Sequence, residues 1–301
     1  VLWLRMPLPF ALDHINLWLV DEPSGWTVVD CGYGDAPTRA LWELHFAATL
    51  GGRPLTRIVA THYHPDHAGN AAWLAARFGC SVAMTSAEYL TAHALAGQHS
   101  GYALADTVAL FTRHGMHVDH LAALDSRGNA YRRGVPELPF AFERMLDRDT
   151  ITLGGASWRV IEGHGHSPEH ASLHCAERAV LVSGDMLLPR ITTNVSVWPA
   201  EPDADPLGHF LDSLAAFEAQ ALGYLLKPVR QEKLLRSIQR AARVTGARLL
   251  RVAEQSQLGR RRQQVCARLG DQLRLIPVDD IYYFAAGQKY GVGIVNLTPM
   301  V

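Results

Sequence analysis

The chain has few cysteines and no long apolar run. None of its apolar stretches approaches the roughly 20 residues that cross a bilayer, so we expect no membrane partner. Its four cysteines are scattered and form no CxxC pair, which argues against a disulfide scaffold and against a structural zinc site built on thiolates. The N-terminus has no signal-peptide pattern. With 301 residues and 48% apolar composition, the sequence predicts a globular cytoplasmic protein that buries a core.

Lysine is absent before Lys227, although the formal net charge of the whole chain is only −1. The earlier part is acidic, whereas residues 227–262 contain eleven lysines and arginines against two glutamates. A shift of this size predicts a boundary between segments of different character.

Short β-rich runs alternate with helical patterns over the first 216 residues, which predicts an α/β fold. Strands are expected at 26–34, 56–60, 81–85, 151–163 and 178–185. Helices are expected at 35–52, 69–79 and 206–219, the last with an apolar face formed by Leu207, Phe210, Leu211, Leu214 and Phe217. Residues 86–147 are expected to be mostly helical and irregular.

The stretch THYHPDHAGN, residues 61–70, places three histidines and one aspartate in six positions directly after a predicted buried strand. Loops at strand ends are where α/β proteins place their chemistry. Imidazole and carboxylate ligands without thiolate suit a catalytic zinc, iron or manganese ion. A polar surface turn is the alternative, and the density of ligand-type residues argues against it.

This stretch resembles the HxHxDH signature of the metallo-β-lactamase superfamily of hydrolases. Three more segments resemble that family in order, namely VVDCG at 28–32, EGHGHSPEHASLH at 162–174 and VLVSGDML at 180–187. The resemblance covers residues 1–216 and implies a four-layer αββα sandwich with metals at its edge.

The resemblance also implies a ligand set for two metals. His62, His64 and His166 would hold the first metal. Asp66, His67 and Asp185 would hold the second, with Asp185 bridging. Two zinc ions are expected, with Fe2+ or Mn2+ as alternatives. The shared hydroxide would attack the substrate, with Asp66 and Asp185 as the catalytic carboxylates.

Other residues are expected to support or surround that set. Asp30 would support the metal loop and His170 would hydrogen-bond near the site. His164 is expected to be a loop residue. The remaining cluster, His114, His117 and His120, has no carboxylate partner at ligand spacing and is expected on the surface, with a substrate contact as the alternative.

The histidine that normally completes the second metal in this family has no counterpart, because the last histidine of the chain is His209. We therefore expect a weakened second site and impaired activity. Residues 217–243 instead resemble the final strand and helix of a response-regulator receiver domain, including the pair Lys227–Pro228. A basic linker would span 244–264. Residues 265–301 resemble a partial, β-rich LytTR-type DNA-binding domain, which suggests a chimera joined near 215–219 or a natural fusion.

Three functions follow from these resemblances. The first is a glyoxalase II-like metallo-hydrolase acting on a small-molecule ester, thioester, lactone or phosphodiester. The second is a mononuclear iron persulfide dioxygenase using His62, His166 and Asp185. The third is a transcription-regulator fragment, whose DNA binding is expected to be weak and not sequence-specific because it rests on charge alone. The oligomeric state is left open.

Overall fold

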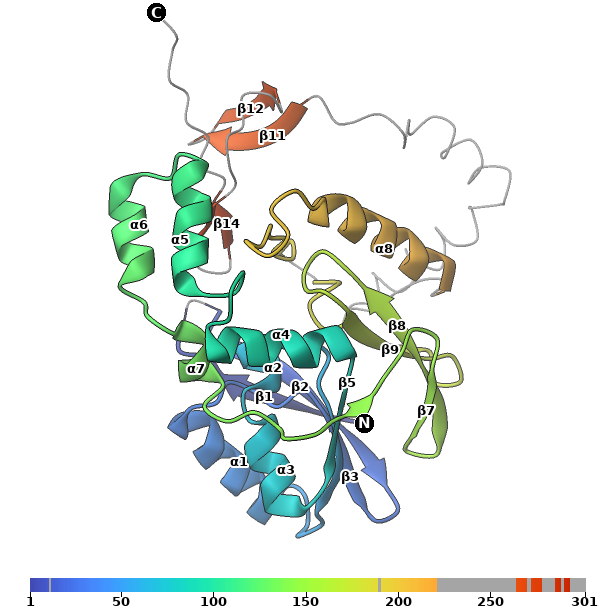
Figure 1. The fold of residues 1–301 in the computed structure, drawn as a ribbon. Helices are drawn as coiled ribbons and strands as arrows, with labels where there is room; N and C mark the ends of the chain where they lie inside the picture. Colours follow the sequence, from blue (N-terminus) through green and yellow to red (C-terminus); the bar gives the residue numbers. More distant parts are fainter. Residues whose placement is uncertain are drawn as a thin grey trace, which may run out of the picture.

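The computed structural model describes residues 1–10, 12–188 and 191–220, and four short stretches at 264–269, 272–277, 285–287 and 290–292. Two β-sheets pack face to face in the first 220 residues, and helices cover their outer faces (Figure 1). This is the αββα sandwich that the resemblance to the metallo-β-lactamase superfamily implies.

The first sheet has the strand order β1-β2-β3-β4-β5-β6. Its strands are β1 (Leu2–Pro7), β2 (His14–Glu22), β3 (Gly25–Val29), β4 (Leu55–Val59), β5 (Ser81–Met84) and β6 (Glu143–Arg144). The first three strands form an antiparallel meander, and β3 to β6 run parallel. Parallel strands need crossover connections, and helices α1 (Ala36–Ala48) and α3 (Ala71–Phe78) supply them between β3, β4 and β5.

The second sheet is antiparallel and has the order β10-β9-β8-β7. Its strands are β7 (Thr150–Leu153), β8 (Ala156–Gly163), β9 (His170–Cys175) and β10 (Val180–Val182). The run 151–163, predicted as one strand with a turn, forms the β7–β8 hairpin.

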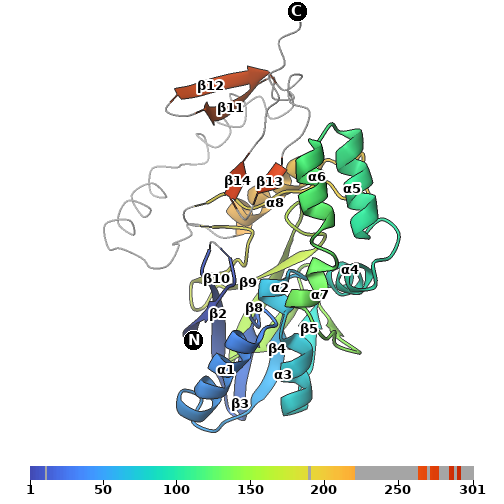
Figure 2. The same cartoon turned by 90° about the vertical axis from the view of Figure 1, so that its left-hand side faces the viewer.

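Two apolar cores hold the layers together. Between the sheets, Val29 and Val59 of the first sheet pack with Trp158 and Leu173 of the second. On the outer face of the first sheet, the fully buried Trp42 packs in the same cluster as Leu74. These two residues come from α1 (Ala36–Ala48) and α3 (Ala71–Phe78), which lie side by side on that face (Figures 1 and 2).

Helix α8 (Pro206–Gln220) covers the outer face of the second sheet (Figure 1). Phe217 is fully buried there against Ile161 and Met186, and Phe210 packs beside them. The predicted apolar face is only partly correct, because Leu207 and Leu211 are 54% and 45% exposed. Phe210 and Phe217 are seven residues apart and so lie on one face, whereas Leu207 and Leu211 fall on its flank among the described residues.

Residues 86–134 form a helical insert between β5 and β6. It consists of α4 (Ser86–Gly97), α5 (Leu104–Arg113), α6 (Val118–Asp125) and α7 (Ala130–Gly134). Helices α5 and α6 stand out as an antiparallel pair in both views (Figures 1 and 2). A short helix, α2 (Pro65–Ala68), lies between β4 and α3.

Two strand pairs follow further along the chain. Strands β11 (Gln264–Leu269) and β12 (Gln272–Pro277) are antiparallel, as are β13 (Ala285–Gly287) and β14 (Tyr290–Val292). The predicted receiver fragment after residue 220 and nearly all of the linker lie outside the described residues. No helix in the described part of the chain is long and apolar enough to span a membrane.

Candidate metal centre

The predicted ligands all follow strand ends at one edge of the sandwich. The 61–67 loop follows β4, His166 follows β8, and Asp185 follows β10. The structure brings five of the six into two overlapping groups whose ligand atoms lie within 4.8 Å of one another. The first group is His62, His64 and His166, and the second is His62, His67 and Asp185.

In the first group, three imidazole nitrogens converge. His62 Nε2 lies 2.9 Å from His64 Nδ1 and 3.1 Å from His166 Nε2. Burial lowers the pKa of His64 to about 3 and holds the pKa values of His62 and His166 below the usual histidine range. All three rings are therefore neutral at pH 7, and neutral imidazole is the form that binds metals.

The tautomer of His166 follows from its outer contacts. His166 Nδ1 lies 2.8 Å from the carbonyl oxygen of Asn194 and 2.8 Å from Thr193 Oγ1. A carbonyl only accepts, so Nδ1 carries the proton and donates it to Asn194. The lone pair of the neutral ring is then on Nε2, which faces the other two histidines.

His67 is oriented in the same way by Asp30. The Nδ1–H of His67 donates to Asp30 Oδ2 at 2.9 Å, which directs Nε2 to the centre. That Nε2 is buried and has no hydrogen-bond partner among the described residues, although Asp185 Oδ1 lies 3.4 Å away and Asp66 Oδ2 lies 3.7 Å away. Burial lowers the pKa of His67, but the carboxylates of Asp30, Asp185 and Asp66 outweigh burial and raise it well above the usual value.

Asp30 also holds the strand that carries the ligand loop. Its Oδ1 accepts hydrogen bonds from the backbone N–H of Thr61 at 2.8 Å and from Thr61 Oγ1 at 2.9 Å. Its own backbone lies in the left-handed region, with φ of 65°. The structure thus places Asp30 between the end of β3 and the first residue of the metal loop.

His170 lies behind the centre, fully buried. Its Nε2 accepts the backbone N–H of Asp185 at 3.1 Å, so this nitrogen is occupied and fixes the Asp185 loop. Gly184 makes the contact feasible, because its φ is 49° and a Cβ there would clash with the His170 ring.

Glu88 was not singled out from the sequence, yet it is fully buried beside the two ligand loops. Its Oε2 accepts from the backbone N–H of Tyr63 at 2.9 Å, and its Oε1 accepts from Ser167 Oγ and the backbone N–H of Glu169, both at 2.7 Å. Burial raises the pKa of Glu88 to about 7, against the lowering effect of these hydrogen bonds. Tyr131 Oη donates to the carbonyl of Tyr63 at 2.8 Å. A signal was available, since Glu88 follows the next parallel strand, β5, at the same sheet edge.

The other histidines do not join the centre. His114, His117 and His120 are exposed on α5 and α6, and His117 caps α6 by accepting the backbone N–H of Asp119. The Nδ1–H of His164 donates to the carbonyl of Pro168.

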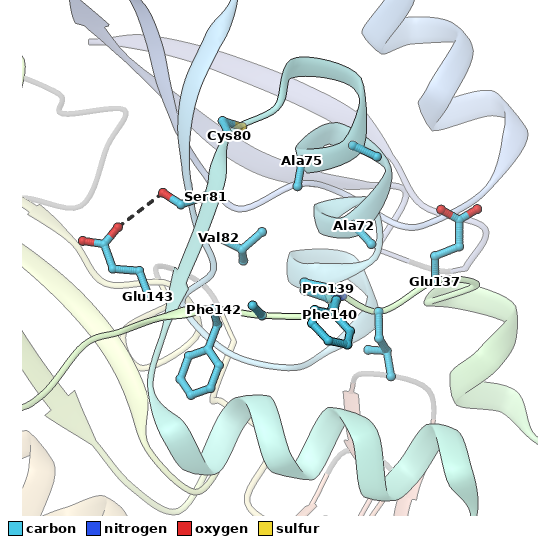
Figure 3. A pocket seen from close by; sticks show the side chains of 13 residues that line it. Ala72, Ala75, Cys80, Ser81, Val82, Glu137, Pro139, Phe140, Phe142 and Glu143 are labelled. Atoms are coloured by element: carbon cyan, nitrogen blue, oxygen red, sulfur yellow. Dashed lines mark hydrogen bonds between the residues drawn. The ribbon is translucent and has the colours of Figure 1, made fainter.

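A separate pocket of about 700 Å3 lies between α3, β5 and residues 137–143 (Figure 3). Ser81 Oγ donates to Glu143 at its rim, and Val82 and Phe142 contribute apolar surface. None of the candidate ligands lines it, so this pocket and the centre are distinct places.

The centre fits a divalent metal. The buried His67 Nε2 has no hydrogen-bond partner among the described residues, and the ring nitrogens of the first group lie close together. A bound divalent cation would accept lone pairs from these nitrogens together. Asp66 belongs to neither of the two ligand groups. The second group contains His62 where Asp66 was predicted.

The family model of the metallo-beta-lactamase superfamily matches residues 11–249. The match covers most of the chain, and the chain therefore belongs to the metallo-beta-lactamase superfamily. A crystal structure of a beta-lactamase domain protein from Burkholderia ambifaria is 44% identical, with a TM-score of 0.64. That comparison covers 74% of this chain and 66% of the other.

Three curated proteins are also similar to this chain. A positive alginate biosynthesis regulatory protein from Pseudomonas aeruginosa is 30% identical over 165 residues, 52% of this chain and 65% of the relative. A probable metallo-hydrolase from Bacillus subtilis is 25% identical over 199 residues, 64% of this chain and 59% of the relative. A hydroxyacylglutathione hydrolase from Albidiferax ferrireducens is 36% identical over 77 residues, 26% of this chain and 27% of the relative. The chain thus spans less than two thirds of the length of each.

Proposed function

We propose that residues 1–216 form a metal-dependent hydrolase that cleaves a small-molecule ester, thioester, lactone or phosphodiester. The observation that carries the proposal is the pair of overlapping ligand groups that share His62. When bound, divalent ions at such a centre polarise the substrate oxygen and lower the pKa of water. Family membership and the probable metallo-hydrolase relative support the same class of reaction.

The chain's own residues would hold and orient the reactants. His62, His64 and His166 offer neutral nitrogens, and the carbonyl of Asn194 fixes the tautomer of His166. Asp66 reaches the centre from the first turn of α2, where its carboxylate can accept a proton from water or from substrate.

Three aromatic rings pack beside this centre. The ring of Tyr63 lies 4.5 Å from that of His64, and Trp198 lies 6.3 Å from Tyr63 and 6.1 Å from Tyr102, measured between ring centroids. Tyr63 itself is buried in the core of the helical insert, so the partly buried Trp198 and Tyr102 are the rings of this group that could contact an apolar portion of a substrate. The short match to a hydroxyacylglutathione hydrolase supports thioesters as the first substrates to test.

Metal analysis and a substrate panel test the proposal together. The purified protein should hold about two zinc ions, with the second bound more weakly because the last family histidine is missing, and should hydrolyse at least one thioester or lactone. His62→Ala should abolish both metal binding and turnover, whereas His114→Ala, an exposed histidine, should change neither. Metal-loaded protein that is inactive on all four substrate classes would contradict the proposal.

A mononuclear iron persulfide dioxygenase is the second candidate. His166 Nε2 lies 3.1 Å from His62 Nε2 and 3.6 Å from Asp185 Oδ2, so these three residues also face one another. About one iron per chain, with oxygen consumption in the presence of a persulfide, would favour this function over hydrolysis.

We further propose that residues 217–301 derive from a transcription regulator. The partial similarity to the Pseudomonas aeruginosa regulatory protein supports descent from a regulator, and the resemblance to receiver and LytTR-type segments assigns that descent to this part of the chain. Sequencing the locus from an independent isolate tests it, because a frame broken at 215–219 would make the junction an artefact. DNA binding should be weak and fall steeply with salt.

A cytoplasmic location is part of the proposal and is supported by three unpaired cysteines among the described residues, Cys31, Cys80 and Cys175.

A further inference from the structure

Glu88 is a buried carboxylate that joins two ligand loops. Neither of its oxygens is exposed, and the residue belongs to the first turn of α4, outside both loops. One oxygen accepts from the backbone of Tyr63, which lies between His62 and His64. The other accepts from Ser167, the neighbour of His166, and from the backbone of Glu169.

The loop around Tyr63 is held on its other side as well. Tyr131, in α7, donates its hydroxyl hydrogen to the carbonyl of Tyr63 at 2.8 Å. The backbone N–H and C=O of this one residue are therefore both bound by side chains of the helical insert. Because Tyr63 separates His62 from His64, any shift of its peptide groups moves both ligands.

We propose that Glu88, together with Tyr131, is a positioning residue that sets the spacing between the His62–His64 loop and His166. The helical insert would thereby determine how well the first metal is held, although it contributes no ligand. This inference rests on the metal centre of the proposed function.

The chemistry of the carboxylate explains why this position takes glutamate. An ionised carboxylate is the side chain that accepts at two oxygens without offering a donor. A glutamine has the same shape, but its amide has one oxygen and one NH2 group. Whichever way it turned, the NH2 would face an N–H or O–H donor, so one loop would lose its anchor and leave a buried donor unpaired.

Cobalt binding to the metal-free protein tests the inference. Glu88→Gln should weaken Co2+ binding about 10- to 100-fold, the usual effect of removing a partner that orients ligands, and should alter the visible absorption spectrum of bound Co2+. Tyr131→Phe removes one hydrogen bond and should weaken binding by a smaller factor. It also provides a second measurement if Glu88→Gln does not fold.

Glu43→Gln is the matched control. It makes the same chemical change at an exposed pair, where Glu43 binds Arg77 at 2.7 and 2.8 Å between α1 and α3. It should leave Co2+ affinity and spectrum unchanged. Folded Glu88→Gln and Tyr131→Phe proteins with wild-type Co2+ affinity and spectrum would overturn the inference while leaving the hydrolase proposal intact. Wild-type protein that binds no Co2+ would instead overturn the metal centre itself.

Discussion

Replacing Asp30 by asparagine should destabilise the metal-free protein strongly, although the two side chains have nearly the same shape. The carboxylate is 2% exposed and accepts three kinds of hydrogen bond, from the backbone and hydroxyl of Thr61 and from the ring of His67. An asparagine oxygen can serve Thr61, but its NH2 group would then face the Nδ1–H of His67.

The magnitude follows from the charge at His67. The neighbouring carboxylates raise its pKa well above the usual value despite burial, so Asp30 and His67 form a buried ion pair when no metal is bound. Removing one member of a buried pair costs about 3–5 kcal/mol. That is a large share of the roughly 5–15 kcal/mol by which domains are stable. Backbone strain does not contribute, because asparagine tolerates the left-handed φ of 65° at this position.

Urea unfolding at pH 7 in the presence of a chelator measures this loss. The midpoint should fall at an unchanged m-value, since the surface exposed on unfolding stays the same. Asp35→Asn is the control: Asp35 caps α1 by accepting the backbone N–H of Thr38, and asparagine caps helices equally well. If Asp30→Asn loses no more stability than Asp35→Asn, the assignment of a buried ion pair is wrong.

Three further predictions concern packing, pH and metal. Gly69→Ala should lower the free energy of unfolding by several kcal/mol, because its Cβ would clash with backbone oxygens of Pro65 and Gly134. Gly51→Ala has open space around it and should lower the free energy of unfolding by only about 1–2 kcal/mol, because of its positive φ. Urea unfolding measures both losses. Burial raises the pKa of Glu88 from 4.5 to about 7, so the protonated form is favoured on folding. The stability of the wild type relative to Glu88→Gln should therefore fall by about 3 kcal/mol as pH rises from about 4.5 through 7. A stability difference that stays constant in urea unfolding at several pH values would contradict this. His62→Ala should remove both metals rather than one, as measured by metal content, because His62 belongs to both ligand groups.

The ligands could be predicted from the sequence because each lies in a short motif at a strand end. The run from Thr61 to His67 contains four of the six predicted ligands, and the spacing between them can be read from the sequence before the fold is known. The alternation of strands and helices likewise predicts an α/β fold, whereas the two facing sheets are implied only by the resemblance to the metallo-β-lactamase superfamily. Helix α1 is capped by Asp35, the first residue of the predicted helix 35–52, and α3 by Gly79, the last residue of the predicted helix 69–79, because caps are local features.

Asp30 and His170 were expected beside the centre, but Glu88 and the contact between His166 and Asn194 were not, because their partners lie far along the chain. Glu88 binds Ser167, 79 positions away, and His166 binds Asn194, 28 positions away. Nothing in the local pattern of either segment indicates these contacts, which exist only after the sheets have packed. The exposure of Leu207 and Leu211 could not be predicted for the same reason. A helical pattern predicts an apolar face but not how much of that face the neighbouring sheet covers.

The pKa of Glu88 and its contacts together suggest why the centre is built this way. Burial makes the ionised carboxylate unfavourable, yet the ionised form is the one that accepts from both ligand loops without a hydroxyl hydrogen on either oxygen. The fold therefore loses stability near neutral pH at the position that fixes the spacing of its ligands. Relative to wild type, the stability of metal-free Glu88→Gln should therefore rise as the pH increases through 7, while its Co2+ affinity stays below that of the wild type. A purely structural role for Glu88 does not predict the lower affinity.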